Sequence, residues 1–317
     1  MATKKAASAK KASANKPAAA AKAKTTVRTL RADDSTTKPA DHTSTTTVAP
    51  AARHTAPARR LPNNVINIVI AELFGTFIFT LAALTAAKDL GALYAGLAFA
   101  AVTLAVGTIS GAHLNPAITV GVWAMRRIRS ILVPFYIGAQ FLGAMLAVIA
   151  INLVTNGSLK LNFGHFNTFS WAMFGIELVG ALVMLFGFAA VRARDLTNTG
   201  RAIGAGLAIV VAFTAAGTLY GRVYSSDLAA YQANASSTTN TTKQPEIPHS
   251  IYAAGPVLNP ATALAATEKT QGELMSGSIG KDDKQYSRLS WEVILGTLIG
   301  AALGGNLYLL VAGRRRD

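Results

Sequence analysis

The sequence predicts an all-α membrane protein in which six transmembrane helices and two re-entrant half-helices form an inverted repeat. Hydrophobic residues make up 51% of the 317 residues and charged residues only 14%, whereas soluble domains average about 25% charged residues. The apolar residues occur in runs long enough to cross a bilayer. The tripeptide Asn-Pro-Ala also occurs twice, once in each half of the chain. These observations favour a pore-containing membrane fold over a soluble enzyme.

Residues 1–63 form a basic tail rich in Lys, Ala, Ser and Thr. Such a segment buries too little apolar surface to offset its ordering entropy, so we expect it to be disordered. Its positive charge favours contact with anionic membrane lipid. The lysines are not interleaved with aromatic residues, so no specific nucleic-acid partner is expected.

Six apolar stretches beyond the tail are long enough to span a membrane, which takes about 20 residues each. They lie near 65–87, 90–110, 131–154, 171–192, 201–220 and 289–312. Two shorter apolar pieces, 111–125 and 255–267, have Gly and Pro near their starts. Short Gly/Pro-interrupted segments in matching places of two halves indicate re-entrant half-helices that line a pore.

Basic residues predict the orientation of these spans. With the tail inside, six crossings place the basic segments 126–129 and 314–316 on the same side as the tail. Cytoplasmic segments carry the excess of Lys and Arg. We therefore expect a multi-pass protein of the cell membrane with both termini, including residues 314–317, in the cytoplasm.

The two halves of the membrane region resemble each other. Glu72 and Glu177 each begin an E-L-x-G motif, 105 positions apart, whereas Asn115 and Asn259 are 144 positions apart. The second spacing is 39 positions longer than the first. We assign the additional residues to the polar stretch 221–254, which we expect to be extracellular. Its composition favours a disordered loop, with a fold over the outer mouth as the alternative. Three spans followed by three related spans must be inverted in the membrane.

The paired Asn-Pro-Ala tripeptides suit two helix starts that meet inside the membrane. Asparagine is a good N-cap, and proline fits the first helical position because it has no N–H to leave unpaired. Alanine allows close approach, and the asparagine amide offers donors to a passing molecule. Two helix N-termini also place partial positive charge where cations would pass. The residues are Asn115, Pro116, Ala117, Asn259, Pro260 and Ala261.

Residues 64–313 resemble the aquaporin (major intrinsic protein) family. The resemblance is carried by SGAHLNPAITVG at 110–121, AELFGT at 71–76, Gln140 followed by FLGA, and the second Asn-Pro-Ala. It implies an aquaporin-like fold with one pore per subunit, a homotetramer, and passive conduction of water. No cofactor is implied.

The family pattern has an arginine directly after the second Asn-Pro-Ala, where this chain has Thr262. By resemblance, the other positions of the selectivity filter fall on Ala95, Phe213 and Pro256. A filter without the arginine loses its fixed charge and its large side chain. We therefore expect the channel to pass water and also small neutral solutes such as glycerol.

Four polar residues are expected to support the pore. By resemblance, Glu72 and Glu177 accept backbone N–H groups of the re-entrant segments, a role that outweighs a proton relay, although charges within spans are commonly functional. Gln140 is expected to link helices. For His113 two alternatives stand open: its ring borders the pore, or the ring is packed and only its carbonyl faces the pore.

Other function classes are disfavoured. The chain has no cysteine, its remaining histidines lack metal-site spacing, and no nucleophile–base pair is evident, so neither an enzyme nor a metal site is expected. The alternatives to a channel are a secondary transporter on the same repeat that uses Glu72 or Glu177, and a non-conducting membrane scaffold.

Overall fold

A computed structural model describes residues 61–85, 90–155, 159–237, 246–277, 279–280 and 283–313. Every described residue belongs to one compact unit, Pro57–Asp317. Most of the predicted tail and the basic end at 314–317 lie outside the described residues.

All six predicted spans are helical. Within the described residues, five helices are long and apolar enough to cross a membrane by length and composition. They are α1 (Val65–Thr85), α4 (Val133–Val154), α5 (Trp171–Arg192), α6 (Asn198–Ser237) and α10 (Trp291–Ala312). The sixth, α2 (Gly91–Val106), has 16 residues and is shorter than the predicted 90–110. It ends early because the chain turns at Gly107 and enters the first re-entrant segment.

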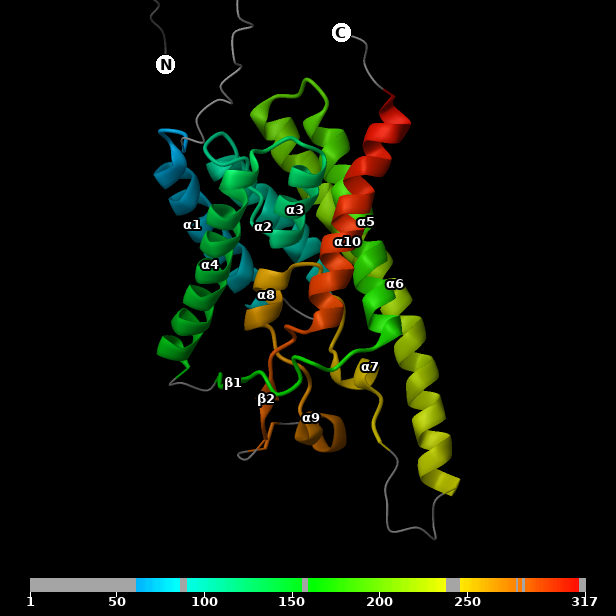
Figure 1. Ribbon diagram of the computed structural model, residues 1–317. Helices are drawn as coiled ribbons and strands as arrows, with labels where there is room; N and C mark the ends of the chain where they lie inside the picture. Colours follow the sequence, from blue (N-terminus) through cyan, green and yellow to red (C-terminus); the bar gives the residue numbers. More distant parts are fainter. Residues whose placement is uncertain are drawn as a thin grey trace, which may run out of the picture. The chain divides into compact units, whose positions relative to one another are not determined.

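Two short helices lie between the long ones: α3 (Pro116–Ala124) and α8 (Pro260–Ala265) (Figure 1). They are the predicted half-helices. We call the side on which α1 begins and α10 ends the terminal face. The opposite side carries α7 (His249–Tyr252), α9 (Gln271–Ser276) and β2 (Gln285–Tyr286), and we call it the insertion face. From its first residue, α3 runs toward the terminal face and α8 toward the insertion face (Figure 1).

The long helices pack in an arrangement that follows the inverted repeat. In the first half α1 packs against α4, and in the second half α5 packs in the same way against α10. The halves then join through α2 and α6. The fold predicted from the sequence is therefore the fold observed.

Glycine permits the closest of these contacts. A Cβ atom on Gly143 of α4 would lie 2.3 Å from the carbonyl oxygen of Leu73 in α1, and one on Gly304 of α10 would lie 2.1 Å from that of Leu182 in α5. Membrane helices associate largely through such close backbone packing, since lipid offers no hydrophobic driving force between them.

The prediction that 221–254 is a disordered loop is wrong for most of this segment. Helix α6 has 40 residues and continues to Ser237, so at 1.5 Å per residue it is about 60 Å long, against a hydrocarbon core of about 30 Å. Residues 246–254 are also ordered and include α7 (His249–Tyr252). The hydroxyl of Tyr220 donates to the carbonyl of Ser250, and the Ser250 hydroxyl bonds to Asp227. These contacts tie the extension of α6 to α7, so this stretch is folded at the insertion face.

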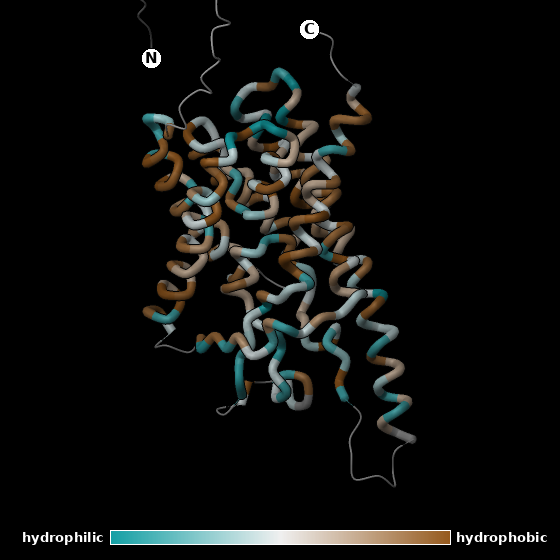
Figure 2. Tube along the Cα trace, viewed as in Figure 1, coloured by the Kyte–Doolittle hydropathy of each residue, from teal (hydrophilic) through white to brown (hydrophobic). Residues whose placement is uncertain are grey.

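The insertion face carries the remaining small elements. Strand β1 (Leu161–Asn162) pairs in parallel with β2 (Gln285–Tyr286), with Leu161 opposite Gln285. Helix α9 (Gln271–Ser276) begins at a capping box formed by Thr270 and Glu273. Figure 2 shows hydrophilic residues concentrated here and hydrophobic residues along the long helices.

The apolar residues serve both a core and a lipid-facing surface. One large cluster of buried apolar residues joins α2, α5 and α6 to α3 and to Leu258, just before α8. Residues such as Leu153, Trp171 and Leu310 are largely exposed on the long helices. Large exposed apolar side chains on such helices fit contact with acyl chains. The chain is a multi-pass membrane protein.

Candidate functional site

The two half-helices begin in the way that the sequence predicts. Asn115 caps α3, and its Oδ1 accepts from Ala117 N at 2.8 Å. Asn259 caps α8, and its Oδ1 accepts from Ala261 N at 3.0 Å and Thr262 N at 3.3 Å. Proline follows each asparagine at the first helical position. Both asparagines are buried.

The two asparagine amides tie the half-helices together. Asn115 Nδ2 donates to the carbonyl of Leu258 at 2.8 Å, and Asn259 Nδ2 donates to the carbonyl of Leu114 at 3.0 Å. Each amide thus bonds the residue that precedes the other asparagine. The two helix N-termini, separated by 144 positions in the sequence, meet at one place.

The re-entrant backbone before each asparagine is conformationally strained. Leu114 and Leu258 both have a φ of 55°, a left-handed conformation that branched and bulky residues seldom adopt. Such strain persists only where surrounding contacts hold the backbone in place.

Two buried glutamates supply those contacts. Glu72 of α1 accepts from His113 N at 2.9 Å and Leu114 N at 2.7 Å, and Glu177 of α5 accepts from Val257 N at 2.9 Å and Leu258 N at 2.8 Å. Both glutamates are completely buried. This is the backbone-holding role that the resemblance implies.

Gln140 and His113 belong to the support of the first segment. Gln140 Nε2 lies 2.8 Å from Glu72 Oε2 and 2.9 Å from Thr119 Oγ1, so it links α4 to α1 and α3. The His113 ring stacks on Tyr136, with centroids 4.6 Å apart, and its Nδ1 lies 3.2 Å from Thr119 Oγ1. The ring is therefore packed, but His113 also lines the cavity described below, so both alternatives for this residue stay open.

The four residues expected to form a filter lie on different elements. Ala95 of α2 is buried and shares an apolar cluster with the partly buried Phe213 of α6. Pro256 lies in the second re-entrant segment. The Thr262 hydroxyl lies 3.2 Å from that of Thr80 and so contacts α1.

A cavity of about 190 Å³ lies toward the terminal face from the paired asparagines. The first re-entrant segment contributes Ser110 and His113, and the end of α5 contributes Phe188 and Arg192. Arg192 Nη1 donates to the carbonyl of Gly111 at 3.2 Å, and its guanidinium carbon is 5.4 Å from the centre of the Phe188 ring.

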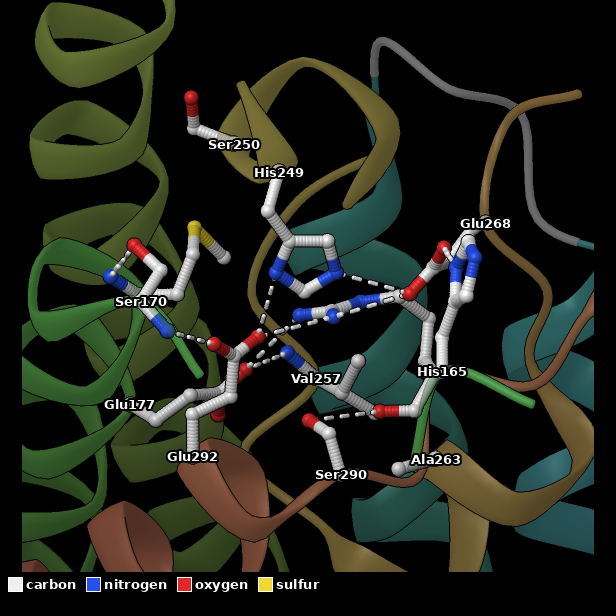
Figure 3. A network of polar contacts seen from close by, with 12 residues as sticks. His165, Ser170, Glu177, His249, Ser250, Val257, Ala263, Glu268, Ser290 and Glu292 are labelled. Carbon is white, nitrogen blue, oxygen red and sulfur yellow. Dashed lines mark hydrogen bonds and ion pairs between the residues drawn. The ribbon is translucent and has the colours of Figure 1, made fainter. Parts of the chain in front are cut away.

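A buried network of charged groups at the insertion face was not predicted (Figure 3). His249 lies between two carboxylates, with Nε2 2.9 Å from Glu268 and Nδ1 3.3 Å from Glu292. On the other side of Glu268, His165 Nδ1 lies at 2.7 Å, and its ring stacks on Tyr286. Burial alone lowers the pKa of His249, but hydrogen bonds to Glu268 and Glu292 outweigh burial and raise that pKa to about 9.

Arg288 connects this network to the second re-entrant segment. Its side chain is 1% exposed and lies 3.3 Å from Glu292 and 3.8 Å from Glu177. The same Glu177 holds the backbone of Val257 and Leu258. Most members of this network are far apart in the sequence, so their spacing could not predict that they meet. Only Arg288 and Glu292, four residues apart, form a pair that the sequence could have indicated. Among the described residues no group of three or more His, Asp or Glu could hold a metal ion.

Residues 59–229 match the family model described as major intrinsic protein. The matched range contains the first Asn-Pro-Ala, while the second lies beyond it. Three similar relatives are probable aquaporin NIP4-2 of Arabidopsis thaliana (35% identical, covering 40% of this chain and 45% of the relative), aquaporin-1 of Ovis aries (36%, covering 33% and 42%) and aquaporin Z of Photorhabdus laumondii (38%, covering 27% and 43%). The chain thus spans less than half the length of these curated relatives.

Among solved structures, one match is the aquaglyceroporin from Plasmodium falciparum. It is 17% identical, with a TM-score of 0.47, and the similarity covers 79% of this chain and 96% of that one.

Proposed function

Because this chain belongs to the major intrinsic protein family, we propose that it is a passive channel for water and small neutral solutes such as glycerol. The observation that carries the proposal is the meeting of two capped half-helix starts, joined through Asn115 and Asn259. Relatives in the family are named aquaporins, and their name alone does not define the solutes of this chain.

The chemistry of the paired starts supports conduction of neutral molecules. A primary amide has two N–H donors, and the cross-tie from Asn259 uses one of them. The second N–H of this amide can donate to a passing water molecule or polyol. It thereby replaces one of the hydrogen bonds that the molecule gives up when it leaves bulk water. The two helix N-termini also direct partial positive charge to the same place, which opposes cations.

The hydrogen bonds that the two buried glutamates accept argue against a proton-coupled transporter. Glu72 accepts four hydrogen bonds: from Ser110 Oγ, Gln140 Nε2 and two backbone N–H groups. Glu177 holds two backbone N–H groups beside Arg288. A carboxylate that cycles its proton would release this strained backbone, so we assign both a supporting role.

The remaining assignments are part of the same proposal. Ala95, Phe213, Pro256 and Thr262 form the selectivity filter on the insertion side. The protein lies in the cell membrane with its terminal face in the cytoplasm, in accord with the arginines of that face, and assembles as a homotetramer with lipid around it.

Stopped-flow light scattering on proteoliposomes tests the channel. We expect water permeability above that of protein-free vesicles with a low activation energy, and measurable glycerol permeability. Saturable flux coupled to an ion gradient would indicate a transporter instead, and permeability equal to that of protein-free vesicles would indicate a scaffold.

A further inference from the structure

The positively charged guanidinium of Arg192 lies at the terminal face, beside the proposed solute path. Its Nη1 donates to the carbonyl of Gly111 at 3.2 Å, and its side chain lines the 190 Å³ cavity together with His113. Gly111 lies four residues before Asn115 in the first re-entrant segment. The guanidinium is thus held against the backbone that leads to the paired asparagines.

The surroundings of Arg192 are strongly basic. Residues 125–132 and 192–201, the loops around this mouth, contain six arginines and a single acid, Asp195. Arg127 lines the same cavity, and Arg201 acts on Arg192 electrostatically. The nearby carboxylate of Glu72 is engaged by its own hydrogen bonds.

The described residues of the insertion side carry no comparable excess of positive charge. Thr262 is uncharged, and Arg288 is surrounded by Glu177, Glu268 and Glu292. With these three carboxylates ionised, even two protonated histidines would only bring the buried network to neutrality. The fixed cation of Arg288 is therefore balanced locally.

We propose that Arg192 is a selectivity-determining residue of the pore, and that its charge at the terminal mouth excludes protons and small cations in place of a charge at Thr262. The inference rests on the proposed channel function. Arg192 is exposed at this mouth, and a cleft lined by charge of one sign repels ions of that sign, most strongly at low ionic strength. In this proposal, Arg192 and the two helix N-termini form the barriers to cations. The filter on the insertion side limits the size of the solutes that pass.

The test uses Arg192→Gln in the full chain, reconstituted in liposomes that contain a pH-sensitive dye. Proton leak is driven by a potassium–valinomycin diffusion potential, and water permeability is measured on the same vesicles. Removing one unit charge within several ångströms of the path should raise the ratio of proton leak to water permeability about tenfold or more. The ratio corrects for differences in the amount of inserted protein.

Two variants control for charge and place. Arg194→Gln removes an arginine that is exposed, as Arg192 is, but does not line this cavity, so it should leave the ratio at the wild-type value. Arg192→Lys keeps the charge and should remain proton-tight. A leak in Arg192→Lys as large as in Arg192→Gln, or an equal leak in Arg194→Gln, would contradict the assignment.

The wild-type protein supplies a second measurement if the variants fail to insert. The Debye length falls from about 30 Å at 0.01 M salt to about 3 Å at 1 M, so choline chloride, which is too large to permeate, should raise the wild-type proton leak several-fold by screening Arg192. An unchanged leak would overturn the inference. Wild-type vesicles with no water permeability would refute the channel itself, whereas water-conducting vesicles with an unchanged ratio in Arg192→Gln would refute only the role of Arg192.

Discussion

Thr262 follows the second Asn-Pro-Ala, and its hydroxyl lies 3.2 Å from that of Thr80 on α1. In the proposed filter, a threonine leaves room that an arginine would occupy. It also offers one rotatable hydroxyl where a guanidinium has five fixed donors. These differences are the physical basis for expecting solutes larger than water.

Thr262→Arg should lower glycerol permeability by a larger factor than water permeability, by about tenfold against about twofold. The larger side chain narrows the path, and the smaller solute is the less affected. Both permeabilities are measured in the same liposomes by stopped-flow light scattering. Thr262→Val keeps the size of the side chain and should still pass glycerol. A wild-type protein that excludes glycerol would show that Pro256 or a neighbour already fills the space.

His249 makes the stability of the insertion face depend on pH. Its pKa is raised to about 9 by Glu268 and Glu292, from a value near 6.5 in the unfolded chain. The stabilisation is therefore fully present below about pH 6.5 and is lost as the pH rises through about 9. A shift of this size corresponds to a contribution on the order of 3 kcal/mol.

Unfolding in mixed micelles, followed by tryptophan fluorescence between pH 6 and 10, measures this dependence. The free energy of unfolding of the wild-type protein should fall across the upper part of the range. His249→Gln should be less stable at pH 6.5 and should show a flatter profile. Equal pH dependence in the two proteins would assign the effect to other groups.

At the scale of the helices, Gly143 shows how close packing fixes the α1–α4 pair. A Cβ at Gly143 would lie 2.3 Å from Leu73 O and 2.9 Å from Phe77 N. Both atoms are backbone, so neither can move without shifting α1. Gly138 lies on the same helix with no heavy atom within 4 Å of such a Cβ.

Gly143→Ala should therefore destabilise the protein by about 1–3 kcal/mol, the usual cost of overpacking. Gly138→Ala, the matched control, should be neutral or stabilising by up to about 1 kcal/mol, because alanine is the better helix former. Unfolding in mixed micelles at constant pH compares the two variants. Similar losses for both would mean that α1 and α4 are not in contact as described.

The sequence was informative about elements where a local pattern specifies them. Apolar runs predict the six spans, and Asn-Pro at 115 and 259 predicts the starts of both half-helices. It was misleading at 221–237, where polar residues suggested a loop, because polarity excludes a membrane span but not a helix. Helix α6 continues there, supported by contacts such as that of Asp227 with Ser250.

The buried network shows the limit of such patterns. His165, His249 and Glu268 are brought together by the fold across more than 100 positions. Each of them alone is an ordinary polar residue of a loop. Long-range pairing of this kind leaves no periodic signal in one sequence, so it was not predicted.

For the whole molecule, the repeat is symmetric in its backbone and asymmetric in its charges. Both re-entrant segments hold a leucine at a φ of 55° against a buried glutamate. Around Glu72 the other partners are the neutral Ser110 and Gln140, whereas Glu177 faces Arg288. The shared features serve the meeting of the two helix starts, which we regard as the core of the pore. The features that differ give each mouth its own charge.

The most direct test of this account is the water permeability of Asn115→Asp and Asn259→Asp in proteoliposomes. Each substitution replaces the amide that bonds across to the other half-helix with a carboxylate, and adds negative charge where two helix N-termini oppose cations. Asn167→Asp changes an exposed asparagine in the loop before α5 and controls for the chemistry of the substitution. We predict that both pore variants lose water permeability by about tenfold or more while Asn167→Asp conducts as the wild type does. Normal conduction and unchanged cation exclusion in both pore variants would contradict the account.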